Sequence, residues 1–157
     1  MRNLSKKTQY SLRALYALGR HYGNGPVLIA KIAQEEVIPL EFLEKLLLDL
    51  KNAGFLESRK GRRGGYLLAR SPEEITVGAV IRSIEGPLAP LPCASETAFR
   101  KCDECVDIAT CGTRMVMRQV RDAIAGILDN TTIADVIRRV EGAREQAGEA
   151  EALMYYI

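Results

Sequence analysis

The chain has 157 residues, 47% of them hydrophobic, and a formal net charge of +2 at pH 7. This length suits one compact domain with an appendage, and the apolar content is sufficient for a core. The sequence contains no run of eighteen apolar residues that would span a membrane, and its first seven residues lack the apolar core of a secretory signal. These features predict a cytoplasmic protein with no membrane partner.

The charges are distributed unevenly along the chain. Residues 1–70 contain 13 Lys and Arg against 6 Asp and Glu, whereas residues 71–157 contain 9 against 14. A basic first half beside an acidic second half indicates that only the first half faces a polyanion. Two ordinary solvated surfaces would show the same charges, so the interpretation depends on the motifs.

Three helices are expected in the first 54 residues. The first runs over about 6–21, and a short second one around 29–33 follows the turn at 23–26. Pro39, placed at a first helical position, opens the third, and Gly54 ends it. Within the third helix four apolar residues share one face: Leu43, Leu46, Leu47 and Leu50. Two such helices joined by a short turn are typical of a helix-turn-helix.

Two short strands, 55–59 and 65–69, enclose a tip rich in glycine and cations. A helix-turn-helix followed by a basic hairpin is the outline of a winged helix, in which the third helix enters the major groove and the wing meets phosphates or the minor groove. Glu41 and Glu44 would repel phosphates, so they either accept from a cytosine amino group, pair with Lys45 or lie on a solvated face. The predicted DNA contacts of the helix and wing are Pro39, Glu41, Phe42, Glu44, Lys45, Arg59, Lys60, Arg62 and Arg63.

Three further helices are expected in the second half. Thr76 is a cap for one helix, which Gly86-Pro87 stops. A long helix begins near Thr113, and a last one follows the capping box Thr132-x-x-Asp135. The long helix repeats apolar residues at a narrow spacing that fits a dimer seam or packing within the chain: Met117, Val120, Ile124 and Ile127. After Glu141 the chain is acidic and rich in small residues, which predicts a mobile tail.

All four cysteines lie within nineteen residues, as Cys93-x8-Cys102-x2-Cys105-x5-Cys111. The segment is rich in charged residues and too polar to bury four thiols as core hydrophobes, although cysteine is usually a buried residue. In a reducing compartment, clustered cysteines more often bind metal or sense redox state than form structural disulfides. The spacing fits an iron–sulfur cluster, a tetrahedral zinc site or a thiol/disulfide pair, and does not separate them. A thiol oxidoreductase is a weaker alternative, because no Rossmann, P-loop or thioredoxin-type context surrounds the motif.

Over essentially its whole length the chain resembles the Rrf2 family of bacterial winged-helix repressors, which includes an iron–sulfur cluster regulator, a nitric-oxide-sensing repressor and a cysteine-metabolism repressor. The segments that carry the resemblance are 4–6 with Tyr10, 22–26, 42–46, 50–54, Gly61, 64–68, 77–78, 84–86 and 128–132. The Gly-Gly-Tyr wing, the cysteine loop and the Leu-Asp-x-x-Thr segment are together highly specific.

The resemblance implies a homodimer joined by the long helix and binding to palindromic promoter DNA. By position, Glu41, Phe42 and Glu44 look like the major-groove contacts, Lys60 takes the place of a wing arginine in the minor groove, and the N-terminal contacts to the DNA backbone are Arg2, Ser5 and Lys6. The family's three cluster cysteines match Cys93, Cys105 and Cys111. Its histidine ligand is replaced by Arg114, and its aspartate ligand near the N-terminus aligns with Gln9.

Cys102 is extra to this pattern, and the simplest inference is that it supplies the fourth ligand. The implied cofactor is a [2Fe–2S] or [4Fe–4S] cluster held by Cys93, Cys102, Cys105 and Cys111 within one subunit, which a purified apo form would lack. The C-terminal Tyr155, Tyr156 and Ile157 resemble the tail of the cysteine-metabolism repressor, which pairs with the cysteine synthase O-acetylserine sulfhydrylase.

We therefore expect a mainly α fold with a small β-hairpin wing, and four segments. These are a winged helix-turn-helix over 1–86, a cysteine-rich sensor loop over 87–112, a dimerisation helix and last helix over 113–142, and a tail over 143–157. The predicted function is a transcriptional repressor that senses iron–sulfur, redox or cysteine status. The alternative is a cysteine-metabolism repressor without a cluster, controlled through its tail by O-acetylserine sulfhydrylase.

Overall fold

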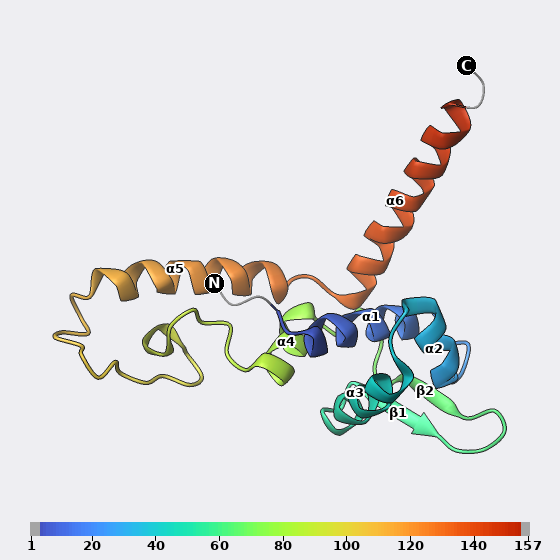
Figure 1. The fold of residues 1–157 in the computed structure, drawn as a ribbon. Helices are drawn as coiled ribbons and strands as arrows, with labels where there is room; N and C mark the ends of the chain where they lie inside the picture. The colour runs from blue at the N-terminus through green and yellow to red at the C-terminus, as the bar shows by residue number, and fades with distance from the viewer. Residues whose placement is uncertain (1–3, 155–157) are drawn as a thin grey trace.

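The computed structural model describes residues 4–154, with side chains up to residue 147, as a helical body from which two long helices extend (Figure 1). The elements in chain order are α1 (Lys6–Arg20), α2 (Ile29–Glu36), α3 (Leu40–Asn52), β1 (Leu56–Arg59), β2 (Gly65–Leu68), α4 (Val77–Glu85), the 3-10 turn η1 (Pro92–Ala94), α5 (Gly112–Leu128) and α6 (Ile133–Met154). The expected fold class, mainly α with a small antiparallel hairpin, is confirmed.

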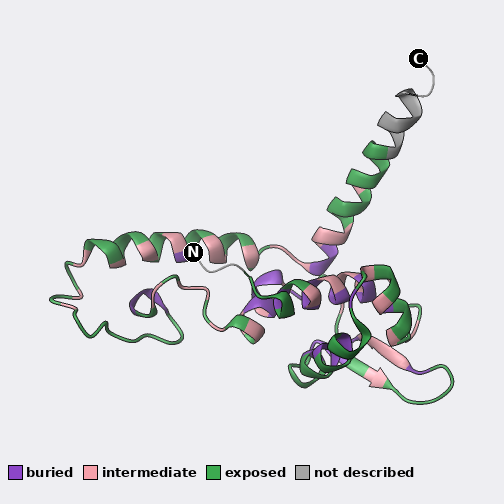
Figure 2. Ribbon diagram, in the orientation of Figure 1, coloured by how far each residue is buried: buried purple, intermediate pink, exposed green. Residues whose placement is uncertain are grey.

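The core lies within the body formed by α1 to α4 and the hairpin, and Figure 2 shows the buried residues gathered there. Helix α1 runs through the middle and contacts α2, α3, α4 and α6. Leu15, Ile32, Leu47 and Val80 are fully buried. Burying one such aliphatic side chain contributes about 1.5–3 kcal/mol, so four helices converging on α1 make this body the stable part of the chain.

The wing is pinned at its base by a close backbone approach. Strands β1 and β2 pair antiparallel, with Arg59 opposite Gly65. Val27 and Tyr66 exchange backbone hydrogen bonds of 2.8 and 2.9 Å. A Cβ atom on Gly65, whose φ is +149°, would lie 2.3 Å from the Val27 carbonyl oxygen, so only glycine admits this pairing.

Two elements differ from the sequence-based expectation. Pro39 is the residue before the first turn of α3 rather than its first helical residue, with ψ at 130°. The last helix, expected to end near residue 142, continues to Met154. Its second half is rich in Ala, Glu, Arg and Gln, whose helix propensities outweigh the cost of Gly142 and Gly148.

Helices α5 and α6 leave the body in different directions (Figure 1). Between them the chain returns to the body at residues 129–132, where Val77 N donates to Thr131 O at 2.9 Å and Ile133 N donates to Ile75 O at 2.9 Å. Gly19 of α1 lets α6 approach closely, since a Cβ there would lie 2.6 Å from Ile137 Cδ1. Across residues 4–154, no helix is long and apolar enough to cross a membrane.

Candidate functional site

Helices α2 and α3 form the predicted helix-turn-helix. The turn between them contains Val37, which adopts the left-handed conformation at φ 51° and is 78% exposed. Beyond the turn, the four leucines of α3 named above face the core. The opposite face of α3 presents to solvent the predicted groove contacts, namely Glu41, Phe42, Glu44 and Lys45.

Phe42 is braced by aromatic packing that the sequence did not indicate. Its ring meets Tyr10 of α1 edge-on at 5.5 Å between centroids, and the Arg13 guanidinium lies over the Tyr10 ring at 5.6 Å. Phe42 is still 38% exposed. The packing therefore fixes the orientation of one side chain on the otherwise flexible, charged face of α3.

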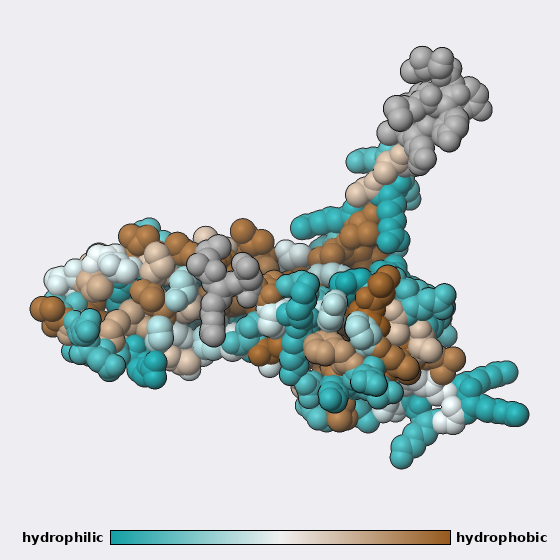
Figure 3. Space-filling model, viewed as in Figure 1, coloured by the Kyte–Doolittle hydropathy of each residue, from teal (hydrophilic) through white to brown (hydrophobic). Residues whose placement is uncertain are grey.

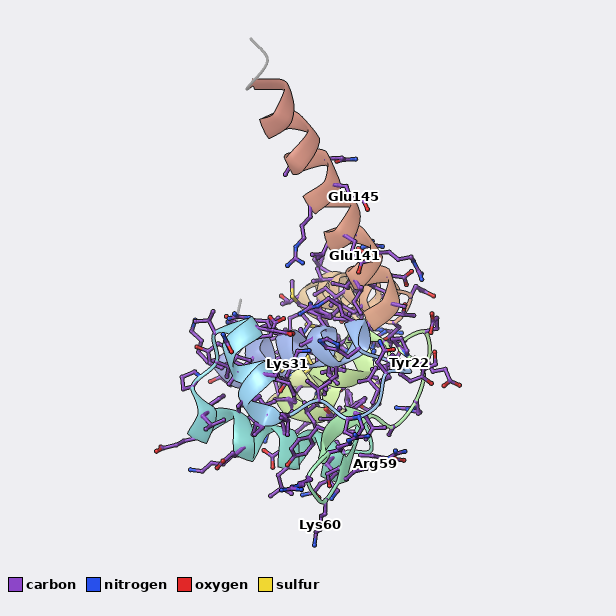
Figure 4. The ribbon with its side chains drawn as sticks, turned by 90° about the vertical axis from the view of Figure 1, so that its right-hand side faces the viewer. Tyr22, Lys31, Arg59, Lys60, Glu141 and Glu145 are labelled. Carbon is purple, nitrogen blue, oxygen red and sulfur yellow. The ribbon has the colours of Figure 1, made fainter. Side chains whose placement is uncertain are left out.

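The wing tip carries cations without acidic partners. Arg59, Lys60, Arg62 and Arg63 are all exposed, and within residues 4–147 none of them forms an ion pair. Figure 4 shows Arg59 and Lys60 at one end of the molecule and Glu141 and Glu145 of α6 toward the other. The side chains that project at the wing in Figure 3 are hydrophilic. Such unneutralised charge is available to phosphates.

The N-terminal contacts have structural roles beside the predicted one. Ser5 caps α1, accepting from Thr8 N at 3.2 Å, and its own backbone N donates to Glu85 Oε1 of α4 at 2.8 Å. The Thr8 hydroxyl also donates to this carboxylate. Lys6 is exposed, and Arg2 lies outside the described residues. Glu85 thus anchors the start of α1, a contact between residues eighty positions apart.

The cysteine loop holds one buried thiol and three more accessible ones. Cys93 sits in η1 and is 3% exposed, whereas Cys102 is exposed and Cys105 and Cys111 are half-buried. The segment does not bury all four thiols, in line with its polar composition, but it does bury Cys93. Burial raises the pKa of Cys93, and a hydrogen bond to the Cys102 thiol together with the nearby charges of Cys102 and Cys111 raises it further.

Between Cys105 and Cys111 the loop is folded by Asp107. Its carboxylate accepts from Ala109 N at 3.0 Å and from the Thr110 hydroxyl at 2.6 Å. These hydrogen bonds lower the pKa of Asp107, the Thr110 hydroxyl contributing most. A local turn thus sets the path between the last two cysteines.

The donor chemistry of the loop fits an iron–sulfur cluster. All four thiols are free, and Cys93 interacts with both Cys102 and Cys111. Thiolates are the usual ligands of such clusters. Among the described residues, however, no three His, Cys, Asp or Glu side chains are gathered as a metal site.

Two arginines of α5 connect the loop to the helix, and the sequence did not reveal either role. Arg114 Nε donates to the Cys93 carbonyl at 2.8 Å, and Arg121 Nη1 donates to the Ala94 carbonyl at 2.6 Å. The side chain of Arg114, which stands where the resemblance places a histidine ligand, is therefore turned to the loop backbone. The one available signal was seven-residue spacing, which puts both arginines on one helix face.

At its other end α5 is joined to α4. Arg82 Nη1 and Nη2 donate to the two carboxylate oxygens of Asp129 at 2.5 and 2.7 Å. A Cβ on Gly78 would lie 2.0 Å from Asp129 Oδ1. This pairing gives a physical reason for two segments that carry the family resemblance, Val77-Gly78 and Leu128-Asp129.

The predicted seam of α5 is only partly covered. Met117, Val120 and Ile124 are half-buried and Ile127 is 67% exposed. Apolar side chains are visible along α5 in Figure 3. Ile124 also lines an open cavity of about 800 Å³ between α4, α5 and residues 87–100. The tail residues Tyr155, Tyr156 and Ile157 lie outside the described residues.

Comparison with known proteins gives one consistent family. The sequence profile of the Rrf2 family, described as an iron-dependent transcriptional regulator, matches residues 4–139. An rrf2-like HTH-type regulator of Rhodobacter capsulatus is 37% identical over 137 residues, 85% of this chain and 91% of that protein. The HTH-type transcriptional regulator CymR of Bacillus subtilis is 33% identical over 154 residues, 98% of this chain and 99% of CymR.

Solved structures show the same relationship. The structure of B. subtilis CymR, described as the global cysteine regulator, has a TM-score of 0.74 at 32% identity and covers 88% of this chain and 98% of that one. T. potens IscR has a TM-score of 0.70 at 34% identity and covers 90% of both chains. The chain therefore belongs to the Rrf2 family of transcriptional regulators rather than to a class of enzymes.

Proposed function

We propose that this regulator is a homodimeric repressor of palindromic promoters that senses iron–sulfur or redox status through its cysteine loop. In this proposal residues 1–86 bind DNA, 87–112 sense, and α5 joins two subunits. The observation that carries it is the path of α5, which begins directly after Cys111 and ends at Asp129, bound to Arg82 of the DNA-binding body. One helix thus links the sensing loop to the body that carries α3 and the wing.

The proposed DNA contacts follow from exposure and charge. In a winged helix, the exposed face of α3 enters the major groove, where Glu44 can accept from a cytosine amino group. The wing cations, Lys60 foremost, meet phosphates or the minor groove. Ser5 and Lys6 bring the start of α1 to the DNA backbone, and its position depends on Glu85.

A salt titration tests the wing. The probe is a duplex carrying the sequence that the full-length protein selects from a random library. K60A is expected to weaken binding and to reduce the slope of log affinity against log salt by about 1, because one phosphate contact is lost. R144A is the matched control, since Arg144 is exposed in α6 between Glu141 and Glu145, which Figure 4 shows toward the other end of the molecule from Lys60. Equal slopes for wild type and K60A would contradict the assignment.

The homodimer is proposed from the apolar residues that α5 leaves in solvent. Ile127 of the predicted seam is 67% exposed, Met117, Val120 and Ile124 are half-buried, and Val116, on the same side of the helix, is 52% exposed. A second copy of α5 would cover them, as in a coiled-coil seam. I127E is expected to convert a dimer into monomers in sedimentation analysis. Q119E, which changes an exposed polar residue of the same helix, is expected to leave the dimer intact. A wild-type protein that sediments as a monomer would refute this part.

Cys93, Cys102, Cys105 and Cys111 would hold the cluster, which when bound supplies a redox- and iron-sensitive group. The chain's own residues set its surroundings: Arg114 and Arg121 hold the Cys93 turn on α5, and Asp107 folds the last part of the loop. The family description as iron-dependent supports this reading. Cys102 distinguishes it from the three-cysteine pattern of the cluster regulator.

Anaerobic purification tests the cofactor. The wild-type protein is expected to be coloured and to contain iron. Its affinity for the operator is expected to change on oxidation, in either direction. C102S should lower iron content, whereas S58A, at a hydroxyl that only accepts from Lys51 at 2.6 Å, should not. A colourless, iron-free protein whose affinity for DNA does not change on adding oxidants or iron chelators would refute cluster sensing.

A second candidate is favoured by the extent of one alignment. The match to CymR covers 98% of this chain, beyond the family profile and into the C-terminal tail. In this alternative the tail residues Tyr155 to Ile157 bind O-acetylserine sulfhydrylase and no cluster forms. Deleting these three residues should then abolish binding to the synthase in calorimetry, while iron content remains at zero in both proteins.

A further inference from the structure

The turn that contains Cys93 is held by two side chains of α5. Arg114 donates to the carbonyl of Cys93, and Arg121, two helical turns later, donates to the carbonyl of Ala94. Arg121 also contacts Glu96 at 3.0 Å and Asp122 at 2.5 Å. It is the buried residue of α5, with 7% of its surface exposed. We call Arg114 and Arg121 the arginine clamp.

The clamp satisfies backbone groups that the turn itself leaves open. The backbone hydrogen bonds of η1 are accepted by the carbonyls of Leu91 and Pro92, and within the described part of the chain no backbone N–H donates to the carbonyls of Cys93 and Ala94. A buried carbonyl without a donor is unfavourable, and a charged donor forms one of the stronger hydrogen bonds. Glu96 and Asp122 in turn neutralise the buried guanidinium of Arg121, which would otherwise be unfavourable.

The four thiols differ in exposure where the clamp acts. Cys93 and Ala94 are 3% and 1% exposed, whereas Cys102 is exposed. Cys102 lies in the part of the loop that neither arginine contacts. The buried thiol of the loop is thus the one whose turn is docked on α5.

We propose that Arg114 and Arg121 are positioning residues that control access to Cys93. They keep its thiol covered when the turn is docked and expose it when the turn leaves α5. This inference deepens the proposed function, since it makes clamp opening the step by which an oxidant or a metal donor reaches Cys93. It also assigns a new role to the position that resembles a histidine ligand: in this chain it binds loop backbone instead.

Site-resolved alkylation tests the clamp in the full-length, metal-free protein under reducing conditions. Iodoacetamide modification of each cysteine is followed by mass spectrometry, and the rate at Cys93 is divided by the rate in the same sample at Cys105, which is half-buried and is not among the cysteines that interact with Cys93. R121A is expected to raise this ratio about tenfold, because loss of a charge-assisted hydrogen bond raises the open population by at least that factor. R114A should raise it less, since Arg114 contributes one hydrogen bond and a contact at 6.0 Å with the Phe99 ring.

R118A is the matched control, because Arg118 is exposed on α5 between the two clamp residues and forms no ion pair within the described chain. Its ratio should stay within twofold of wild type. R121K, which keeps a charge and one donor, should restore part of the protection. If R121A remains folded by circular dichroism and its ratio rises less than threefold, the clamp is refuted. If R121A unfolds, R114A decides by the same threshold. Because no metal is present, the result is independent of whether the loop binds a cluster.

Discussion

A single methyl group at Gly78 tests how α4 is joined to α5. The added Cβ would lie 2.0 Å from Asp129 Oδ1 and 3.1 Å from Arg82 Nη1. To relieve this contact, the carboxylate has to leave the guanidinium that now donates two hydrogen bonds to it. G78A should therefore break the Arg82–Asp129 pair without changing either partner.

Opposing effects of similar size set the expected stability. Alanine in place of a helical glycine stabilises by about 0.5–1 kcal/mol. Arg82 and Asp129 are 36% and 40% exposed, so solvent screening limits the loss of their ion pair to about 0.5–1 kcal/mol. Displacing the carboxylate adds off-rotamer strain of about 1 kcal/mol. G78A should therefore lower the free energy of unfolding by about 1 kcal/mol.

In D129A the same change should instead raise the free energy of unfolding by about 0.5–1 kcal/mol, since only the helix-propensity gain remains. Urea unfolding of wild type, G78A, D129A and the double variant gives the coupling, at one protein concentration because a dimer's stability depends on it. G142A, whose Cβ meets no atom within 4 Å, is a control that should behave identically in both backgrounds. If G78A is equally stabilising in both, Asp129 does not occupy the space beside Gly78.

Three further changes have expected outcomes in urea unfolding. Hydrogen bonds from the Thr132 backbone N–H and hydroxyl lower the pKa of Asp135 to about 2. The carboxylate therefore stabilises the fold fully above about pH 4 and loses this effect as the pH falls toward 2. The difference in free energy of unfolding between wild type and D135A should shrink over that range. G65A should cost about 2 kcal/mol or more, because its Cβ would meet the Val27 carbonyl at 2.3 Å, whereas R62A on the exposed tip should stay within about 0.5 kcal/mol. V37G should raise the free energy of unfolding by about 1 kcal/mol, because a β-branched residue at φ 51° is strained and the Val37 side chain is 78% exposed. A lower free energy of unfolding in V37G would mean that the Val37 side chain makes stabilising contacts despite its exposure.

Elements whose signals lie within one helical turn could be predicted from the sequence. The Thr76 hydroxyl accepts from Ala79 N at 3.2 Å. Thr132 N donates to the Asp135 carboxylate and Asp135 N donates to the Thr132 hydroxyl, as the capping box requires. The leucine stripe of α3 faces the core as its spacing indicates. Such signals are reliable because both partners are close in sequence, so the path of the rest of the chain does not matter.

Contacts between distant residues could not be predicted. Arg114 and Arg121 donate to carbonyls 21 and 27 positions away in the sequence. The Glu85 carboxylate accepts from Ser5 N, which is 80 positions away. Backbone carbonyls have no sequence signature, so a side chain that binds them cannot be matched to a partner by residue type. For the same reason the composition of the cysteine loop could not indicate which of its four thiols is buried, namely Cys93, whose turn is docked on α5.

Helix α5 has the geometry of a lever. Its 17 residues span about 25 Å between the cysteine loop and the ion pair at Asp129. With the Asp129 end fixed, a displacement of about 3 Å at Cys111 tilts the axis by about 7°, as simple trigonometry on that length requires. Under the proposed function, a movement no larger than the width of one side chain at the sulfur atoms would change the angle between α5 and the body that carries α3. In a symmetric pair the two rotations would add, changing the spacing of the recognition helices while each body keeps its own fold.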